Sequence, residues 1–319
     1  MIKATAITGP TASGKTSLSL DIAEALGCEI ISCDSMQIYK EMDIGTAKAT
    51  ADEQARVRHH LIDVISPSEA FSANSYREMA LRAAEDIASR GKIPLFVGGT
   101  GLYLATLMRG ECPEVPESDP EYRRQIEEKI ISEEDKLELH KRLGKIDPVS
   151  ADTIHYNNVR RVIRALEIYD ATGKPKSYFD ELSRRPSDKI SIKHVTLDFH
   201  KRETLYARAD ARVEAMLRDG LEAEVRSLLD RGLLDESTTA SQAIGYKELV
   251  LAIRGDMSVD AAVAELKQAT RNYAKRQLTW FRHDGSAVRV YRDREDGTLR
   301  DNADIFSECM NIFKEFISE

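Results

Sequence analysis

The sequence predicts an α/β protein in which a parallel sheet carries a phosphate-binding loop and a helical domain is inserted into that core. Three observations predict this class. Strand-like and amphipathic helical segments alternate through residues 4–101, a glycine-rich motif separates the first strand from the first helix, and the sequence after Gly110 becomes linker-like and then helical. Alternating strands and helices build parallel sheets, because each crossover returns the chain to the same edge.

The elements of the predicted sheet follow in order. Residues 4–8 are largely alternating and β-branched, so they form the first strand, and the helix at 16–26 has apolar residues at helical spacing until Gly27 ends it. The next elements alternate in the same way: a strand at 29–33, a helix at 74–89 and a strand at 93–97. Such alternation predicts a parallel sheet.

The middle of the chain differs. Helical patterns lie at about 120–143 and 157–171, a strand returns at about 190–199, and the chain from 203 to 282 is mostly helical. We therefore predict a core formed by residues 1–115 and 186–319, with residues 116–185 as a helical insertion. Residues 295–319 carry no motif that predicts a role.

Composition limits the class of protein. With 42% hydrophobic and 31% charged residues among 319, the chain is not disordered throughout. No apolar run is long enough to cross a membrane, and we expect neither a signal peptide nor membrane association. The four cysteines are scattered and form no Cys-x-x-Cys pair, so we expect a reducing, cytoplasmic environment.

The glycine-rich motif carries the first chemistry. It fits the pattern G-x-x-x-x-G-K-[ST] in the strand–loop–helix context that this pattern requires, and its residues are Gly9, Pro10, Thr11, Ala12, Ser13, Gly14, Lys15 and Thr16. Backbone N–H groups of such a loop surround phosphate oxygens, Lys15 reaches the terminal phosphate, and the Thr16 hydroxyl is a ligand for Mg²⁺. The motif identifies a polyphosphate but no reaction, so a nucleotide kinase, an NTPase and a transferase with a diphosphate leaving group remain open.

Polar residues follow two further strands. Asp34 comes directly after the second strand, where it is a candidate general base or metal ligand, or else a helix N-cap. Gly98, Gly99, Thr100 and Gly101 follow the strand at 93–97, where they form either a second substrate contact or a simple tight turn.

Basic residues are arranged in rows, although the net charge of −8 argues weakly against nucleic acid. The rows have helical spacing and comprise Arg160, Arg161 and Arg164; Arg208 and Arg212; and Lys267, Arg271 and Lys275. Each row either follows an RNA backbone or clamps a diphosphate, or else is a solvated face paired with acids. The tract 274–282 adds Trp280, the only tryptophan, and Phe281, which either present aromatic rings to bases or, as is more usual, lie in the core.

Seven sequence blocks occur together and in order from residue 4 to about 282. They are GPTASGKT (9–16), DSMQIY (34–39), MDIGTAK (42–48), VGGTGLY (97–103), NNVRRVIRALE (157–167), AIGYKE (243–248) and AKRQLTWFR (274–282). In these blocks the chain resembles the bacterial tRNA dimethylallyltransferase (tRNA isopentenyltransferase) family.

The resemblance implies a function. The family transfers a dimethylallyl group from dimethylallyl diphosphate to N6 of the adenine 3′ to the anticodon, tRNA position 37, giving N6-dimethylallyladenosine and diphosphate. It uses Mg²⁺ and holds the prenyl diphosphate, rather than ATP, in the phosphate loop. Its fold is a P-loop NTPase-like core with a helical insertion that closes on the anticodon stem-loop, and we expect a monomer.

The resemblance also implies roles for residues. Asp34 matches the general base, Arg212 the diphosphate arginine with Arg208 one turn away, and Thr11 a threonine near the reacting groups. The positions that match tRNA-contacting stretches are Asp34, Ser35, Met36, Gln37, Thr100, Gly101, Arg124, Arg160, Arg161, Arg164, Gln242, Gly245, Tyr246 and Lys247.

Two other functions remain as alternatives. An ATP-dependent nucleoside or nucleotide kinase would use the same phosphate loop, with the inserted helices as a lid. A non-catalytic RNA-binding module would use only the basic rows, and its binding would be steeply salt-dependent.

Overall fold

The computed structural model describes residues 1–110, 119–183, 185–235 and 238–318. It divides into two compact units, which we call the core unit (Met1–Met108 and Lys189–Glu319) and the inserted unit (Arg109–Asp188). Within the described ranges, the helices are all too short or too polar to cross a membrane.

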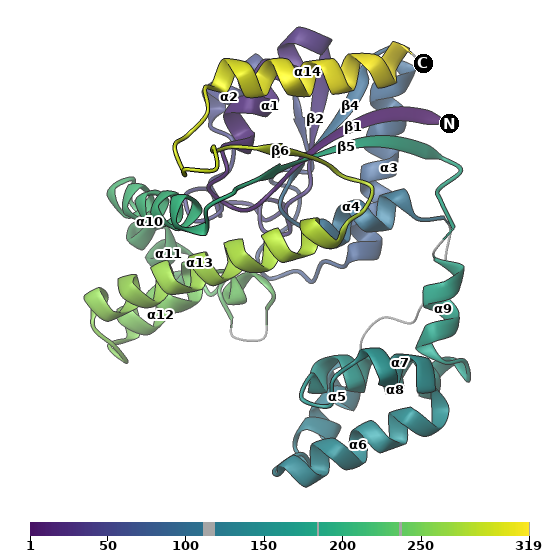
Figure 1. Cartoon of the computed structure of the whole chain (residues 1–319). Helices are drawn as coiled ribbons and strands as arrows, with labels where there is room; N and C mark the ends of the chain where they lie inside the picture. The colour runs from purple at the N-terminus through teal and green to yellow at the C-terminus, as the bar shows by residue number, and fades with distance from the viewer. Residues whose placement is uncertain (111–118, 184, 236–237, 319) are drawn as a thin grey trace. The chain divides into compact units, whose positions relative to one another are not determined.

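The core unit contains a parallel sheet, as predicted (Figure 1). The strand order is β3-β2-β4-β1-β5-β6, and every pairing between neighbours is parallel. The strands are β1 (Ile2–Thr8), β2 (Cys28–Ser32), β3 (His59–His60), β4 (Ile93–Gly98), β5 (Ile190–Asp198) and β6 (Val288–Tyr291). Because β1 lies between β4 and β5, the chain leaves β1 where the strand order reverses, which is where ligands bind in open α/β sheets.

Helices cover both faces of the sheet. On one face lie α1 (Lys15–Leu26) and α14 (Asn302–Ser318), and on the other α3 (Ala73–Ser89) and α4 (Gly101–Met108). The alternation of side chains explains the two faces: Ile30 packs in the cluster beneath α1, whereas its neighbour Ile31 packs beneath α3.

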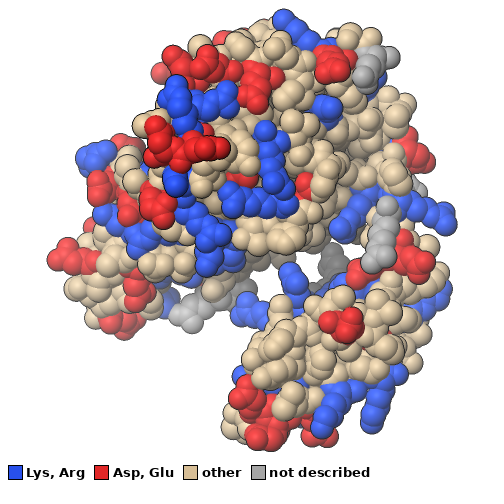
Figure 2. Space-filling view, viewed as in Figure 1, with Lys and Arg blue, Asp and Glu red and all other residues tan. Residues whose placement is uncertain are grey.

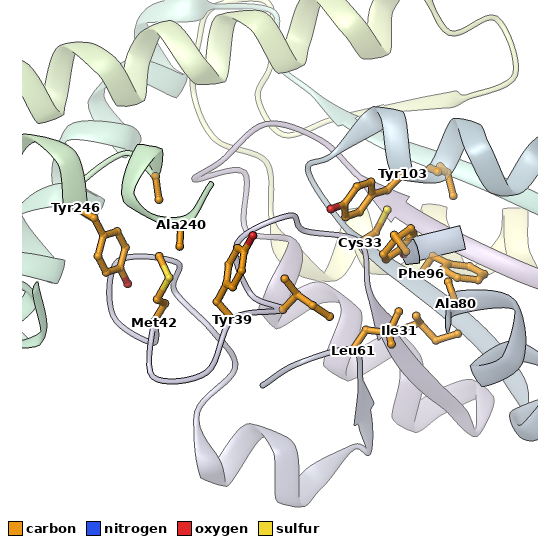
Figure 3. Packing of buried hydrophobic residues seen from close by; sticks show 14 of the residues in the cluster. Ile31, Cys33, Tyr39, Met42, Leu61, Ala80, Phe96, Tyr103, Ala240 and Tyr246 are labelled. Atoms are coloured by element: carbon orange, nitrogen blue, oxygen red, sulfur yellow. The ribbon is translucent and has the colours of Figure 1, made fainter. Parts of the chain in front are cut away.

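The remaining helices of the core unit are α2 (Ala51–Arg56), α10 (Arg202–Arg218), α11 (Leu221–Asp230), α12 (Tyr246–Arg254), α13 (Val259–His283) and a 3₁₀ turn at Ala240–Gln242. The long helix α13 packs against both α10 and α12 (Figure 1). The larger hydrophobic cluster continues from the sheet into these helices, where Tyr39 and Met42 lie between Phe96 and Tyr246 (Figure 3). The loop after β2 is therefore fixed by packing on both sides.

The last residues of the chain add a strand to the sheet and a helix to the layer that packs on it. Residues beyond about 284 form β6 and α14, neither of which the sequence analysis predicted. Cys309 and Phe313 of α14 are fully buried in the cluster that also contains Leu18 of α1 and Val195 of β5. The last helix is thus part of the core.

The inserted unit is helical, with α5 (Pro120–Glu127), α6 (Glu133–Ile146), α7 (Pro148–Thr153), α8 (Val159–Thr172) and α9 (Lys176–Leu182). The helical pattern expected at 120–143 forms two helices in the structure, because a capping box of Ser132 and Asp135 starts the second one, α6. Leu143, Val162 and Leu166 form its hydrophobic centre. Asp147 caps α7 and accepts a hydrogen bond from the Ser177 backbone N–H, at 2.9 Å, which ties α7 to α9.

Candidate active site

A pocket of about 340 Å³ lies within the core unit at the carboxyl ends of the strands. Its wall includes the phosphate loop from Thr11 to Thr16, the segment from Asp34 to Gln37, Gly98, Gly99, Arg212, Gln242, Tyr273, Arg276 and Gln277. The sheet topology therefore brings together residues that are more than two hundred positions apart in the sequence.

The phosphate loop is built as its motif predicts. Gly14 is the N-cap of α1 and has a positive φ of 86°, so the helix begins at Lys15 with its first N–H groups without a side-chain cap. The Lys15 Nζ donates to the backbone oxygens of Gly9, at 3.0 Å, and Pro10, at 2.7 Å. The pKa of Lys15 is lowered to about 7, first by burial and then by the Arg212 guanidinium, while the Asp34 carboxylate acts in the opposite direction.

Two arginines of α10 lie near this loop. Arg212 lines the pocket and donates to the Thr46 carbonyl at 3.4 Å. Arg208 lies outside the pocket wall, and its Nε donates to the Ala12 carbonyl at 2.7 Å. Burial lowers the pKa of both arginines. Neither forms an ion pair with a carboxylate within the described part of the chain, so both charges are available to an anionic ligand.

Asp34 faces the same pocket. Its Oδ1 accepts the Met36 N–H at 2.9 Å, which closes a turn, and the Ser35 N–H donates to the Thr100 Oγ1 at 3.0 Å. No helix begins after Asp34 in this described segment, so the helix N-cap alternative is wrong. The second carboxylate oxygen, Oδ2, receives none of these bonds.

Gln277 is a site residue that sequence reasoning missed. Its Oε1 accepts the Thr11 N–H at 2.8 Å, and its Nε2 donates to the Gly99 carbonyl at 2.9 Å. A side chain at Gly99 would collide with this amide, which explains why glycine occupies that position. Gln277 therefore joins the phosphate loop to the turn after β4.

Glu224 of α11 is a second residue that was missed. Its carboxylate accepts the backbone N–H groups of Asp43, Ile44 and Gly45, at 2.8–3.1 Å, and the Tyr246 hydroxyl at 2.6 Å. This carboxylate fixes the loop whose continuation, Thr46 and Ala47, lines the pocket.

The residues predicted to contact tRNA fall into different environments. Asp34 to Gln37 and Gln242 line the pocket, Thr100 bonds to that segment, Gly101 starts α4, and Gly245 and Lys247 lie at the start of α12. Tyr246 is fully buried and supports the loop through Glu224, so its side chain presents no surface to RNA. Arg124, Arg160, Arg161 and Arg164 belong to the inserted unit.

The basic rows are partly neutralised. Lys267 pairs with Glu214 and Arg271 with Asp210, so for these two cations the solvated, acid-paired alternative is correct. In the inserted unit, Arg124 lies between Glu121 and Glu128, and Arg164 pairs with Glu167. Acidic and basic side chains are interspersed over the face shown in Figure 2.

The tract 274–282 divides between core and surface. Phe281 is buried as expected, but Trp280 is 42% exposed. The core alternative is therefore correct for Phe281, whereas Trp280 lies at the surface.

The sheet and the loop at the start of α1 define an α/β protein with a P-loop-like fold. The chain belongs to the IPP transferase family, whose model matches residues 37–284. The tRNA dimethylallyltransferase of Acetivibrio thermocellus is 46% identical over 292 residues, which cover 91% of this chain and 92% of that protein. The enzyme of the same name from Geobacillus thermodenitrificans is 48% identical, and the match covers 88% of each chain.

Solved structures are similar along the whole chain. The tRNA isopentenylpyrophosphate transferase of Bacillus halodurans is 38% identical with a TM-score of 0.72, and the match covers 100% of this chain and 97% of that one. A eukaryotic dimethylallyltransferase, described as acting on tRNA, is 30% identical with a TM-score of 0.78, covering 100% of this chain and 80% of that one. The fold class expected from the sequence is thereby confirmed.

Proposed function

We propose that this chain is a tRNA dimethylallyltransferase, which transfers the dimethylallyl group of dimethylallyl diphosphate to N6 of adenine 37 in tRNA. The observation that carries the proposal is the shared pocket, in which the carboxylate of Asp34 faces the cations Lys15 and Arg212. Transfer to an amine needs a proton acceptor beside the nucleophile and positive charge beside the leaving group.

The cationic wall suits the leaving group. As the allylic C–O bond breaks, its electron pair remains on the diphosphate, whose negative charge increases. Lys15, Arg212 and the N–H groups at the start of α1 would stabilise that charge, with Arg208 holding the loop through Ala12. Thr11, whose N–H is held by Gln277, lies at the same wall.

Asp34 is suited to the role of proton acceptor. The exocyclic amine of adenine is a poor nucleophile, because its lone pair is delocalised into the ring. As the N6–C bond forms, N6 must lose one proton, and the Asp34 carboxylate, which lines the pocket, would accept it. The adenine has to leave its base stack to reach such a site.

The residues at the loop also fit Mg²⁺. The Thr16 hydroxyl offers an oxygen ligand on the pocket wall, and Mg²⁺ in phosphate sites takes few protein ligands and completes its shell with phosphate and water. This agrees with the described residues, which contain no cluster of three acidic, His or Cys ligands. The ion would neutralise part of the diphosphate charge.

We further propose that the inserted unit contacts the anticodon stem-loop. Arg160 and Arg161 are exposed on α8 and are suited to phosphate contacts. Arg124 would have to break its ion pairs with Glu121 and Glu128 before it could bind an RNA phosphate.

One assay tests the function. Purified protein is incubated with unmodified tRNA, Mg²⁺ and dimethylallyl diphosphate, and the digested RNA is analysed by nucleoside mass spectrometry, with ATP replacing the prenyl donor in a parallel reaction. We expect N6-dimethylallyladenosine only with the prenyl donor. Absence of that product with a verified tRNA substrate, or phosphorylation of a nucleoside with ATP, would contradict the proposal.

A further inference from the structure

Two arginines from distant parts of the chain converge on the phosphate loop at Gly14, outside the wall of the pocket. They are Arg208 of α10 and Arg292, which directly follows β6, and we call them the arginine pair. Gly14 lines the pocket, whereas neither arginine does. A methyl group added to Gly14 would lie 3.5 Å from the Nη2 atoms of both arginines, so these two atoms are at most twice that distance apart.

The hydrogen bonds of the arginine pair go to neutral oxygens and leave donors unused. Within the described residues, Arg208 forms one hydrogen bond, from its Nε to the Ala12 carbonyl at 2.7 Å. Arg292 keeps only 6% of its surface exposed, and its Nη2 donates to the Asn302 side chain at 2.9 Å. The buried Nε of Arg292 has no hydrogen-bond partner in the same ranges. An unpaired buried donor is unfavourable, so this atom points to an acceptor supplied by a ligand.

The carboxylates at this end of the sheet are engaged elsewhere. Asp198, the last residue of β5, pairs with Arg282 at 2.7 Å, and Glu308 pairs with Arg300 at 2.8 Å. Asp293 is fully buried and accepts two backbone N–H groups of the segment after β5, at 2.7 and 3.0 Å. Across the described part of the chain, the arginine pair therefore lacks an ion-pair partner, and two like charges this close are unfavourable without an anion.

We propose that the arginine pair forms a second phosphate subsite, separate from the pocket, which binds one phosphate group beside the phosphate loop. Two guanidinium groups at this separation can donate to different oxygens of one phosphate, and the start of α1 adds positive potential. A bound phosphate would neutralise both arginines and stabilise the loop that Arg208 holds at Ala12. Free phosphate and the phosphate group of a nucleotide share this chemistry.

Equilibrium dialysis with radiolabelled inorganic phosphate tests the subsite, because it counts binding sites and needs neither tRNA nor a prenyl donor. We expect wild type to have a site in addition to the phosphate loop. Lys15→Met should weaken binding at the loop only, and Arg292→Gln should raise the Kd of the additional site about 10- to 100-fold, the effect of losing a charge-assisted hydrogen bond. A single site, or an additional site that Arg292→Gln leaves unchanged, would overturn the proposal.

Two further variants show whether charge at this position is what matters. Arg292→Lys retains the charge and should recover part of the affinity lost in Arg292→Gln. Arg294→Gln is the matched control, because Arg294 is exposed, lies two residues further on and donates to the Thr298 hydroxyl and the Leu299 carbonyl. It should bind phosphate as wild type does, and an equal loss in this variant would contradict a specific subsite.

Stability provides a second readout that separates lost binding from lost folding. In the Lys15→Met background, phosphate should raise the midpoint of thermal unfolding, and adding Arg292→Gln should remove most of that rise. Without phosphate, Arg292→Gln should leave the midpoint constant or raise it, because it removes a buried charge that has no carboxylate partner. An equal rise with phosphate in both backgrounds would overturn the proposal.

Competition by adenosine monophosphate distinguishes the two sources of the phosphate group. Displacement of the labelled phosphate from the additional site at concentrations below those needed for unlabelled phosphate would identify a nucleotide ligand. Displacement only at higher concentrations would identify free phosphate as the ligand. The subsite does not depend on the proposed function: a protein that binds phosphate at the arginine pair but makes no N6-dimethylallyladenosine would disprove the function and leave the subsite in place.

Discussion

Two sets of cations in the core unit differ in what neutralises them. Away from the pocket, Arg56 binds Glu24 and Asp21, and Arg90 binds Glu29 and Asp86; these carboxylates raise the pKa of both arginines. Around the phosphate loop the opposite holds. Burial lowers the pKa of the cations there, and their hydrogen bonds go to uncharged oxygens.

A further arginine extends the second group. Arg292, directly after β6, is buried, donates to the Asn302 side chain at 2.9 Å, and has its pKa lowered by burial and by Arg208. Buried cations without anionic partners destabilise the free protein, so such a group persists where a ligand supplies the negative charge. This contrast leads us to propose that charge at the pocket serves binding and catalysis, whereas charge elsewhere serves stability.

The carboxylate that faces the cationic group should give the largest effect. Asp34→Asn keeps the shape of the side chain but removes the proton acceptor, and we expect prenyl transfer to fall about 10²- to 10⁴-fold. Single-turnover kinetics with saturating tRNA would measure this. Affinities for tRNA and diphosphate should stay near those of wild type, and transfer within a few-fold of wild type would show that Asp34 is not the base.

Replacement of a pocket cation should separate activity from stability. Lys15→Met removes a charge that the transition state needs, so we expect transfer to fall about 10²- to 10³-fold. The same change removes a buried charge without a carboxylate partner, so the midpoint of chemical denaturation should stay constant or rise. A clear loss of stability in the ligand-free variant would place Lys15 in the group of structural cations.

The pKa of Lys15 makes diphosphate binding pH-dependent. Because this pKa is about 7 in the free protein and a bound anion raises it, binding above that pH takes up a proton. Affinity should therefore decrease by up to about tenfold per pH unit above 7 until the pKa of the bound state is reached. Calorimetry at about pH 8 in buffers of different ionisation enthalpy should detect the uptake.

Lys15→Met is the control for this experiment, since protons taken up by the diphosphate itself remain in the variant. Equal proton uptake by variant and wild type would contradict the assignment to Lys15. In the free protein the same pKa has another consequence: stability should increase as pH rises from 7 towards 10.5, because only the unfolded chain then still binds the proton.

The sequence was sufficient to predict the parts of this site that are local in the chain, but not the distant side chains that hold its loops in position. The phosphate loop and Asp34 were predictable, because motif spacing and the ends of strands are local features. Gln277 and Glu224 were not, since they act on backbone groups 266 and 179–181 residues away. Helix α14 was missed for a related reason: its apolar face packs against β5 and α1, which are distant in the sequence.

For the charges away from the pocket we expect the opposite result from that for Lys15: their replacement should lower stability and leave activity unchanged. Glu29 is buried and receives bonds from Arg90, His60 and Lys92, which hold its pKa far below the usual range. Glu29→Gln should lower the free energy of unfolding by about 1–3 kcal/mol, because the amide cannot satisfy three donors. Urea denaturation would measure this, and prenyl transfer by the folded variant should equal that of wild type.

The pH dependence of this stabilisation distinguishes it from a packing effect. A depressed carboxylate pKa stabilises the fold at pH values above the unfolded value of 4.5, and the stabilisation is lost as pH falls towards the folded pKa. The difference in stability between wild type and Glu29→Gln should therefore shrink below about pH 4.5, because the unfolded wild-type chain then takes up a proton that the folded carboxylate does not. A difference that is constant with pH would mean that Glu29 acts through its volume, and the division between structural and functional charges would then not extend to this end of β2.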